Sequence, residues 1–312
     1  MEIIYYPDDS CPNNWTESVI ALGNFDGVHR GHAKLLERVN SRAAERGVTA
    51  AVLTFDPHPP KVIRPDKAPA LLMTTQQKIT YLEQSGIHAT AIVRFTGGLA
   101  QWTPEQFVTS VLVDWLHVAE VWVGSNFLFG HERKGNFSLL RSLGSIYDFR
   151  VAKIDPVRYK DFVVSSTRIR RLLSEGYVDE AGSLLGHHYC IDGEVVRGSN
   201  RGTHQGFPTA NLLTDNEILP PDGVYASTVT IDGVIHAAVT NIGVRPTFEI
   251  SGDRVVESHL LRFSGDLYGR HVRVAFVKRL REERLFSSSS ELKNQIVVDC
   301  EEARALFEKM SL

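Results

Sequence analysis

Hydrophobic runs of strand length alternate with amphipathic stretches through the first half of the chain. A helix is predicted over His32 to Arg46, where Leu35, Leu36 and Val39 form one apolar stripe. Strands are predicted at Val19 to Leu22, Ala50 to Phe55, Ala89 to Arg94, Glu120 to Val123 and Arg150 to Ile154, and further helices at Thr75 to Gln84, Pro104 to about Leu116 and around Leu139 to Leu143. This α/β alternation predicts a doubly wound, mostly parallel sheet with helices on both faces.

The pattern changes near residue 183, and from Gly193 onward the chain reads as strands separated by Gly, Pro, Asn and Asp. Strands are predicted at Val224 to Ile231, Val234 to Asn241, Val255 to Phe263 and His271 to Lys278, and a terminal helix at about Glu291 to Lys309. Asp232-Gly233 predicts a hairpin turn between the first two strands. The second half is therefore predicted to be a small antiparallel β-barrel with a C-terminal helix. We place the domains at residues 1–183 and 184–312.

Composition narrows the functional classes. The chain has 312 residues, with 34 basic and 37 acidic side chains and a formal net charge of −3, so nothing favours nucleic acid as a partner. Three widely spaced cysteines fit neither a disulfide framework nor a zinc site. No run of about 20 apolar residues predicts a membrane span, and the N-terminus does not read as a leader. The expected location is the cytoplasm, and the charged run Arg279 to Arg284 is expected to be a solvated face.

The first candidate site lies where the first predicted strand meets the first helix. Residues 23–32 read GNFDGVHRGH, so three glycines allow the backbone to approach a ligand closely. The start of the helix offers unpaired N–H groups to a phosphate. His29 and His32 bracket Gly31 and can donate hydrogen bonds to phosphate oxygens as charge develops.

A second anion site is predicted at residues 165–168. Ser165, Ser166 and Thr167 form a hydroxyl-rich cap before a helix, and Arg168 puts a guanidinium in its first turn.

The histidine motif, in its strand–turn–helix context, resembles that of the nucleotidyltransferase superfamily. Residues 23–32, together with the later SSTRIR at 165–170, resemble its FMN adenylyltransferase branch, and the segments TFDPHP (54–59) and GSNFLFG (124–130) agree with it. The resemblance implies that His29, His32 and Arg168 act on the phosphates. It implies nucleotide contacts from Gly23, Asn24, Phe25, Gly31, Ser165, Ser166 and Thr167, and flavin contacts from Asp56, His58, Pro59 and Asn126.

The second half carries another glycine-rich phosphate loop. Gly198 and Gly202 precede GFPTANL at residues 206–212, in which Thr209 and Asn211 are hard oxygen donors two residues apart. On an extended segment both could reach one Mg²⁺ or phosphate. With the later NIGVRPTF (241–248), ESHLL (257–261) and DLYG (266–269), this half resembles riboflavin kinase. The resemblance makes Glu257 the catalytic base, Arg245 a flavin contact, and Thr209 with Asn211 the metal ligands.

The two resemblances together cover nearly the whole chain and point to the bifunctional riboflavin kinase/FMN adenylyltransferase family. The implied substrates are riboflavin, FMN and ATP with Mg²⁺, and the implied reactions are phosphorylation of riboflavin to FMN and adenylylation of FMN to FAD. No nucleic acid or membrane partner is expected, and a homo-oligomer is possible. The chain departs from the family's usual residues at Asn126, Thr203, Gln205 and Arg262. Two alternatives stay open: one half has lost or changed its activity, or the chain is a flavin-binding regulator.

Overall fold

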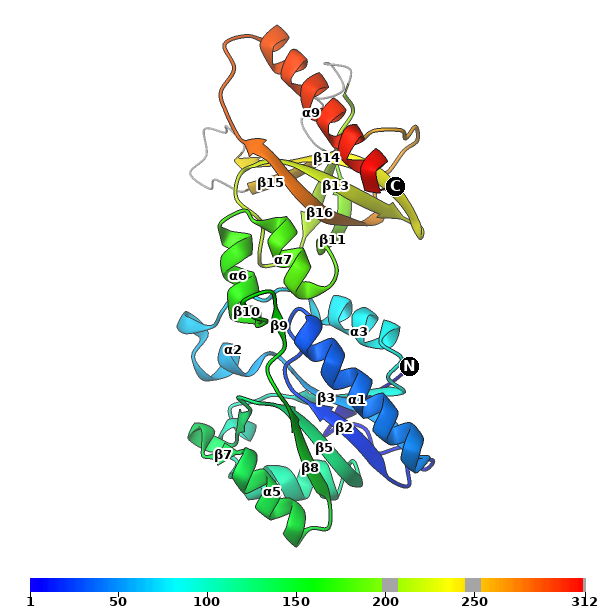
Figure 1. Cartoon of the computed structure of the whole chain (residues 1–312), viewed down its shortest axis with the longest axis vertical. Coiled ribbons are helices and arrows are strands. Elements are labelled where there is room, and N and C mark those ends of the chain that lie inside the picture. Colours follow the sequence, from blue (N-terminus) through cyan, green and yellow to red (C-terminus); the bar gives the residue numbers. More distant parts are fainter. Residues whose placement is uncertain (198–206, 245–253, 311–312) are drawn as a thin grey trace. The chain divides into compact units, whose positions relative to one another are not determined.

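The computed structural model describes residues 1–197, 207–244 and 254–310 (Figure 1). The chain divides into two compact units. The first comprises Met1–Ala70 and Thr75–Ser165, and the second comprises Leu71–Thr74 and Ser166–Leu312. The boundary of the catalytic domains at residues 183 and 184 stays a prediction.

A six-stranded parallel sheet forms the centre of the first unit. Its order is β1-β4-β3-β2-β5-β8, and every neighbouring pair is parallel. The strands are β1 (Glu2–Tyr6), β2 (Ser18–Leu22), β3 (Thr49–Asp56), β4 (Ala89–Arg94), β5 (Val118–Gly124) and β8 (Arg150–Ile154). Ile20 and Leu22 lie in the core beneath Phe107 and Val108, and the alternate residues Val19 and Ala21 are equally buried on the other face. Both faces are covered, so the predicted doubly wound sheet is confirmed.

The helices of this unit follow the predicted amphipathic stripes. They are α1 (Arg30–Arg46), α2 (Pro59–Ile63), α3 (Thr75–Gln84), α4 (Pro104–Phe107) and α5 (Phe137–Ile146). α1 buries Leu35, Leu36 and Val39 as predicted. Thr103 and Gln106 cap α4 reciprocally, but the helix predicted to reach about Leu116 changes after Phe107 into the π-helical turn η3 (Val108–Val113).

Short elements connect these parts of the first unit. Three are 3₁₀ turns: η1 (Pro65–Lys67), η2 (Leu99–Gln101) and η4 (His131–Arg133). Two are small antiparallel pairs: β6 (Leu128–Phe129) with β7 (Gly135–Asn136), and β9 (Arg158–Tyr159) with β10 (Phe162–Val163).

The second unit begins with α6 (Ser166–Ser174) and α7 (Val178–Leu185) and continues into a closed antiparallel barrel. The barrel order is β11-β12-β15-β14-β13-β16. Its strands are β11 (Tyr189–Val196), β12 (Ala210–Thr214), β13 (Gly223–Ile231), β14 (Val234–Val244), β15 (Arg254–Leu260) and β16 (His271–Glu282), and the chain ends in α9 (Ser289–Met310). The predicted barrel, hairpin at Asp232-Gly233 and terminal helix are therefore confirmed.

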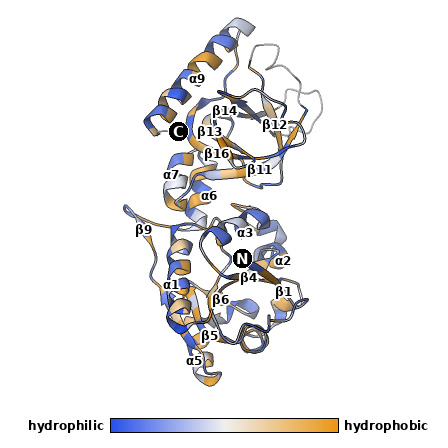
Figure 2. Ribbon diagram, turned by 90° about the vertical axis from the view of Figure 1, so that its right-hand side faces the viewer, coloured by the Kyte–Doolittle hydropathy of each residue, from blue (hydrophilic) through white to orange (hydrophobic). Residues whose placement is uncertain are grey.

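The barrel interior is mainly apolar but contains one chain of hydroxyl groups, and a second apolar face lies outside the barrel beneath α9. A hydroxyl chain crosses three strands inside: Ser227 lies 2.6 Å from Thr240, and Thr240 lies 2.8 Å from Ser258. Outside, Val224 and Val239 pack with Phe307 of α9. Figure 2 shows hydrophilic and hydrophobic residues alternating along α9, as expected of a helix with one buried face.

The charged run at the end of β16 is only partly the solvated face that we expected, because Glu282, Glu283 and Arg284 are exposed whereas Arg279 and Arg281 are half-buried. Arg281 donates to Asp299 of α9 through Nε at 3.0 Å and Nη2 at 2.9 Å, and Asp299 is only 3% exposed. Arg279 donates to the carbonyl of Asp222 at 2.7 Å. These arginines satisfy buried acceptors, which the local pattern of charges does not reveal.

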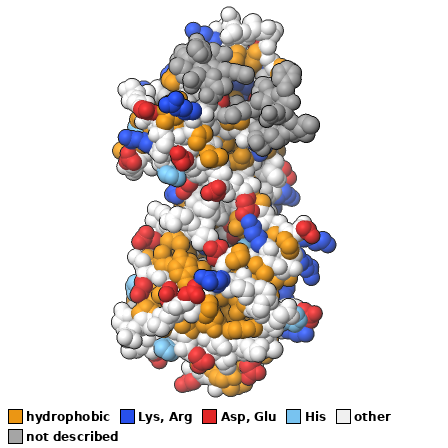
Figure 3. Space-filling model, turned by 180° about the vertical axis from the view of Figure 1, so that it is seen from behind, with side chains coloured by type: hydrophobic (Ala, Val, Ile, Leu, Met, Phe, Trp, Pro, Cys, Tyr) orange, Lys and Arg blue, Asp and Glu red, His pale blue; other side chains and the backbone are white. Residues whose placement is uncertain are grey.

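Among the described residues, we find no helix with both the length and the apolar character needed to cross a bilayer. Figure 3 shows hydrophobic side chains gathered on the rear face of the first unit.

Candidate active sites

The turn between β2 and α1 is held in a strained, compact shape. Phe25, Gly27 and Val28 have φ values of 52°, 89° and 34°, and the Phe25 side chain is completely buried. Positive φ is costly for Phe and Val, so the packing of the turn must maintain it. Asn24 is left exposed on the outside of this turn.

His29 and His32 meet at the start of α1. The His29 Nδ1 accepts a hydrogen bond from the backbone N–H of His32 at 3.3 Å and so caps the helix. The two rings are stacked, with centroids 3.7 Å apart and planes 8° from parallel. Because its Nδ1 is an acceptor, a neutral His29 carries its proton on Nε2.

Gly31 allows this stacking. A Cβ at Gly31 would lie 3.1 Å from Cε1 and 3.2 Å from Nδ1 of His29, closer than ordinary contact. The structure therefore brings the three predicted motif residues together and explains why the middle one is glycine.

Burial lowers the pKa of His32 well below its ordinary value, and the neighbouring His29 and Lys78 lower it further. His32 is therefore neutral at pH 7, and its Nδ1 has no hydrogen-bond partner among the residues that the structure describes. Lys78, on α3, is a residue that our sequence analysis missed.

The predicted flavin contacts lie at two places in the first unit. Asp56 ends β3, His58 is buried just before α2, and Pro59 is the first residue of α2. Asn126 is exposed in the loop between β5 and β6.

An aromatic cluster begins on the same strand as Asp56. Phe55 contacts Phe95 at 5.8 Å and Phe107 at 6.1 Å between ring centroids, and Phe107 contacts Phe129 at 5.9 Å. The aromatic cluster and the Asp56 side chain lie on opposite faces of the sheet, because Phe55 and Asp56 are consecutive residues of β3.

The predicted Ser-Ser-Thr-Arg site lies at the start of α6. Ser165 is the last residue of the first unit, whereas Ser166, Thr167 and Arg168 form the first turn of α6 in the second unit.

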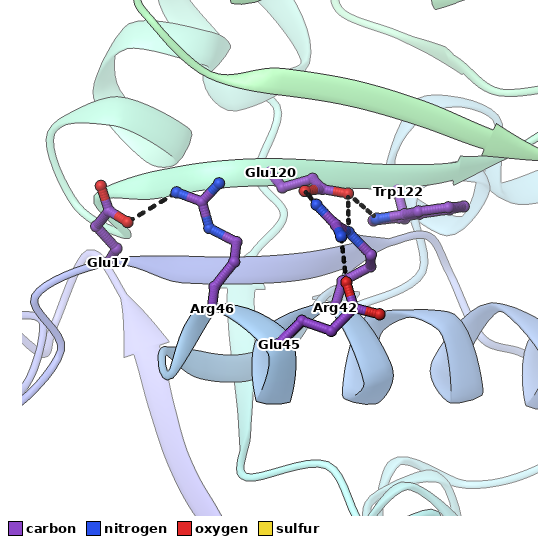
Figure 4. Close-up of polar contacts among 6 residues, drawn as sticks. All are labelled: Glu17, Arg42, Glu45, Arg46, Glu120 and Trp122. Atoms are coloured by element: carbon purple, nitrogen blue, oxygen red, sulfur yellow. Dashed lines mark hydrogen bonds and ion pairs between the residues drawn. The ribbon is translucent and has the colours of Figure 1, made fainter.

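The far half of α1 is tied to the sheet by charged residues (Figure 4). Arg42 donates to Glu120 of β5 through Nε at 3.1 Å and Nη2 at 3.0 Å, and Trp122 donates to the same carboxylate at 2.8 Å. Burial alone would raise the pKa of Glu120, but the hydrogen bonds from Arg42 and Trp122 outweigh it and hold the pKa below its ordinary value. Arg46 pairs with Glu17 at 3.0 Å. These pairs fix the helix whose first turn carries the histidines.

In the barrel, Glu257 lies between two asparagines. It is in register with Asn211 of β12 on one side and with Asn241 of β14 on the other. Directly opposed residues share a face of the sheet, so the three side chains form a polar row. Glu257 is half-buried, and Asn211 is only 5% exposed. The sequence analysis identified Glu257 and Asn211 but not Asn241.

Asn241 also contacts Glu283, just beyond β16. Burial and the nearby Asp222 raise the pKa of Glu283, while a hydrogen bond with the Asn241 side chain lowers it and does not cancel the rise. A carboxylate accepts from the amide N–H, which turns the oxygen of Asn241 away from Glu283.

Asn211 is the stronger of the two predicted metal ligands. Its Oδ1 is buried and makes no hydrogen bond within the described part of the chain, which suits an oxygen reserved for a ligand. Thr209 is half-buried, just before β12. Within the described residues, no cluster of three or more His, Cys, Asp and Glu side chains could hold a metal ion. Gly198, Gly202 and Arg245, together with Thr203 and Gln205, lie outside the described residues.

The comparisons with known proteins cover both halves of the chain. A family model of FAD synthetase matches residues 11–168, and a model of riboflavin kinase matches residues 185–307. Bifunctional riboflavin kinase/FMN adenylyltransferases from Escherichia coli and Bacillus subtilis are 40% and 36% identical, over 93% and 98% of this chain and 92% and 98% of their own lengths.

Among solved structures, one described as a macrolide-efflux protein from Streptococcus pneumoniae superposes with a TM-score of 0.87 and 29% identity, covering 97% of this chain and 99% of that one. It shows that the whole two-unit architecture recurs. With matching models over both halves and relatives of 33–40% identity along most of its length, the chain belongs to the bifunctional riboflavin kinase/FMN adenylyltransferase family.

Proposed function

We propose that the two reactions of this family are carried out by two separate sets of residues, the polar row around Glu257 and the histidine pair at the start of α1. The chain has both activities, adenylyl transfer in the N-terminal half and riboflavin phosphorylation in the C-terminal half. The observation that carries the proposal is the difference between the two sets. The barrel row contains a carboxylate in register between two amides, whereas the α1 turn presents imidazole donors.

For the kinase step, Glu257 accepts the proton of the ribityl 5′-hydroxyl of riboflavin as that oxygen attacks the γ-phosphorus of ATP. The bond between the γ-phosphorus and its bridging oxygen breaks, and ADP leaves. Asn211 and Asn241 flank Glu257 on the two neighbouring strands. A hydroxyl needs such a base at pH 7 because it is a weak nucleophile.

We further propose that Thr209 and Asn211 hold Mg²⁺ together with the phosphates of ATP. The buried, unbonded Oδ1 of Asn211 fits a hard cation, and oxygen is the donor that Mg²⁺ prefers. The ion would neutralise charge on the phosphates.

For adenylyl transfer, a phosphate oxygen of FMN attacks the α-phosphorus of ATP and pyrophosphate leaves. This phosphate is largely dianionic at pH 7, with a second pKa of about 6, so no protein base is required. The N–H groups of His29 and His32 donate to the phosphate oxygens as charge spreads. Arg168 is a predicted further donor, and Asp56, His58 and Pro59 are predicted flavin contacts.

A product assay tests this division. Riboflavin or, in a separate reaction, FMN is supplied with MgATP to the purified protein, and FMN and FAD are separated by chromatography. Glu257→Gln should abolish FMN formation yet leave FMN to FAD conversion intact, and His32→Ala should do the reverse. Matched controls are Glu282→Gln at the exposed end of β16 and His117→Ala in the first unit.

Loss of both activities in either variant, with the controls active, would contradict two separate sites. Absence of both products from the unmodified protein would favour the flavin-binding regulator, and FMN without FAD would favour loss of one half. A cytoplasmic location and assembly into a homo-oligomer also remain proposals.

A further inference from the structure

A buried lysine supports the turn that carries the histidines. Lys78 of α3 is only 6% exposed, and its Nζ lies 3.5 Å from Oγ1 of Thr54 on β3. Thr54 in turn donates to the carbonyl oxygen of Asn24 at 3.2 Å. One polar chain therefore joins α3, β3 and the β2–α1 turn. Lysine is seldom buried this deeply unless its charge is compensated.

Two carboxylates compensate Lys78. Burial lowers the pKa of Lys78, while the carboxylates of Asp26 and Asp56 raise it and partly oppose that effect. Asp26 belongs to the β2–α1 turn and is 4% exposed, and Asp56 ends β3. An ammonium beside two carboxylates holds the turn and the strand end together, whereas a neutral side chain would leave both negative charges without this partner.

Lys78 also acts on His32 through its charge. The burial of His32, the neighbouring His29 and, least of the three, the Lys78 cation all disfavour a second proton on His32. Three further groups influence the charges of Lys78 and His32. They are His29 from the cap of α1, which acts on His32, and Asp26 and Asp56, which act on Lys78.

We propose that Lys78 is a positioning residue for adenylyl transfer, which holds the β2–α1 turn through Thr54 and Asp26 and the end of β3 through Asp56. This inference rests on the proposed role of His29 and His32. Lys78 keeps the two stacked rings in place, and its charge adds to the effects of burial and of His29 that keep His32 a neutral N–H donor. It does not itself exchange a proton with either substrate.

The test compares Lys78→Met with Lys67→Met, which removes an exposed lysine of the same unit. The first readout is the pKa of His32, from NMR titration of the free protein, with the ring signals assigned through His32→Gln. Lys78→Met should raise this pKa because a nearby cation is removed and two carboxylates remain. Lys67→Met should leave it unchanged. Failure of the pKa to move would overturn the proposal.

The second readout is kinetic. Lys78→Met should lower kcat of adenylyl transfer by about tenfold or more, as expected of misplaced donors, with the kinase rate unchanged. Adenylyl transfer within twofold of the unmodified protein would overturn the positioning role. Thr54→Val should give a smaller kinetic loss without moving the His32 pKa, because it breaks the polar chain but keeps the charge.

Two measurements keep the proposal falsifiable if Lys78→Met does not fold. The His32 pKa of the unmodified protein must lie well below its ordinary value, and Thr54→Val must slow adenylyl transfer; an ordinary pKa or an unchanged rate overturns the proposal. Failure of the proposed function gives a different pattern. The His32→Ala variant would keep full adenylyl transfer, although the Lys78→Met variant would still show a raised His32 pKa.

Discussion

Replacing Gly31 by alanine tests whether the placement of the His29 ring controls adenylyl transfer. The added Cβ would lie 3.1 Å and 3.2 Å from two ring atoms of His29, whereas carbon contacts are usually at about 3.5–4.0 Å. The ring must therefore shift by about half an ångström. The cap hydrogen bond from His32 N to His29 Nδ1 is already 3.3 Å long, so this shift breaks it.

The expected effects on stability nearly cancel. Alanine in place of glycine within a helix gains about 0.5–1 kcal/mol. Loss of an N-cap costs about 1 kcal/mol. The free energy of unfolding should thus change by less than about 0.5 kcal/mol. The rate should respond more strongly, because a misplacement of about 1 Å can cost about 100-fold, and half that shift suggests about tenfold.

The assay measures adenylyl transfer and riboflavin phosphorylation in the same preparation, with chemical denaturation to follow stability. Gly97→Ala is the matched control, since a Cβ there meets nothing within 4 Å. Gly31→Ala should slow adenylyl transfer alone. An adenylyl transfer rate within twofold of the unmodified protein, at equal stability, would refute the reasoning that the ring position matters.

Two further substitutions probe the helix tie and the metal ligand. Arg42→Met leaves the Glu120 carboxylate without its cation and should lower the free energy of unfolding at pH 7, as measured by chemical denaturation. Because the pKa of Glu120 is lowered in the folded protein, the ion pair stabilises the fold at pH values above the ordinary pKa of glutamate. The difference in the free energy of unfolding between the variant and the unmodified protein should vanish as the pH falls through the lowered pKa. An equal difference at pH 3 and pH 7 would exclude this linkage. Asn211→Ala should raise the Mg²⁺ concentration needed for half-maximal phosphorylation by about tenfold and leave adenylyl transfer unchanged; an unaltered Mg²⁺ requirement would remove Asn211 from the metal site.

The elements with strong periodicity could be predicted from the sequence almost to the residue. α3 and β4 have the predicted bounds, and the stripe of α1 is the one that packs. β1 was not predicted: its Ile3 and Tyr5 are exposed at the edge of the sheet, so the run does not read as a buried strand. The residues of the histidine motif could be found because they are close together in the chain.

Residues whose role depends on distant partners could not be found this way. Lys78 reads as the polar face of an amphipathic helix, and only its proximity to Asp26 and Asp56 explains its burial. Asn241 belongs to the segment NIGVRPTF, but only the register shows that it lies opposite Glu257. From the sequence alone Arg281 resembles a surface charge, because its partner Asp299 lies 18 residues later, in α9.

The position of Glu257 in β15 restricts how this barrel can vary. Its neighbour Ser258 points inward to the hydroxyl chain, so the two residues occupy opposite faces of the strand. Deleting or inserting a single residue before Glu257 in β15 would exchange these faces and bury a carboxylate among hydroxyls. Length changes within β15 ahead of Glu257 are therefore incompatible with phosphorylation.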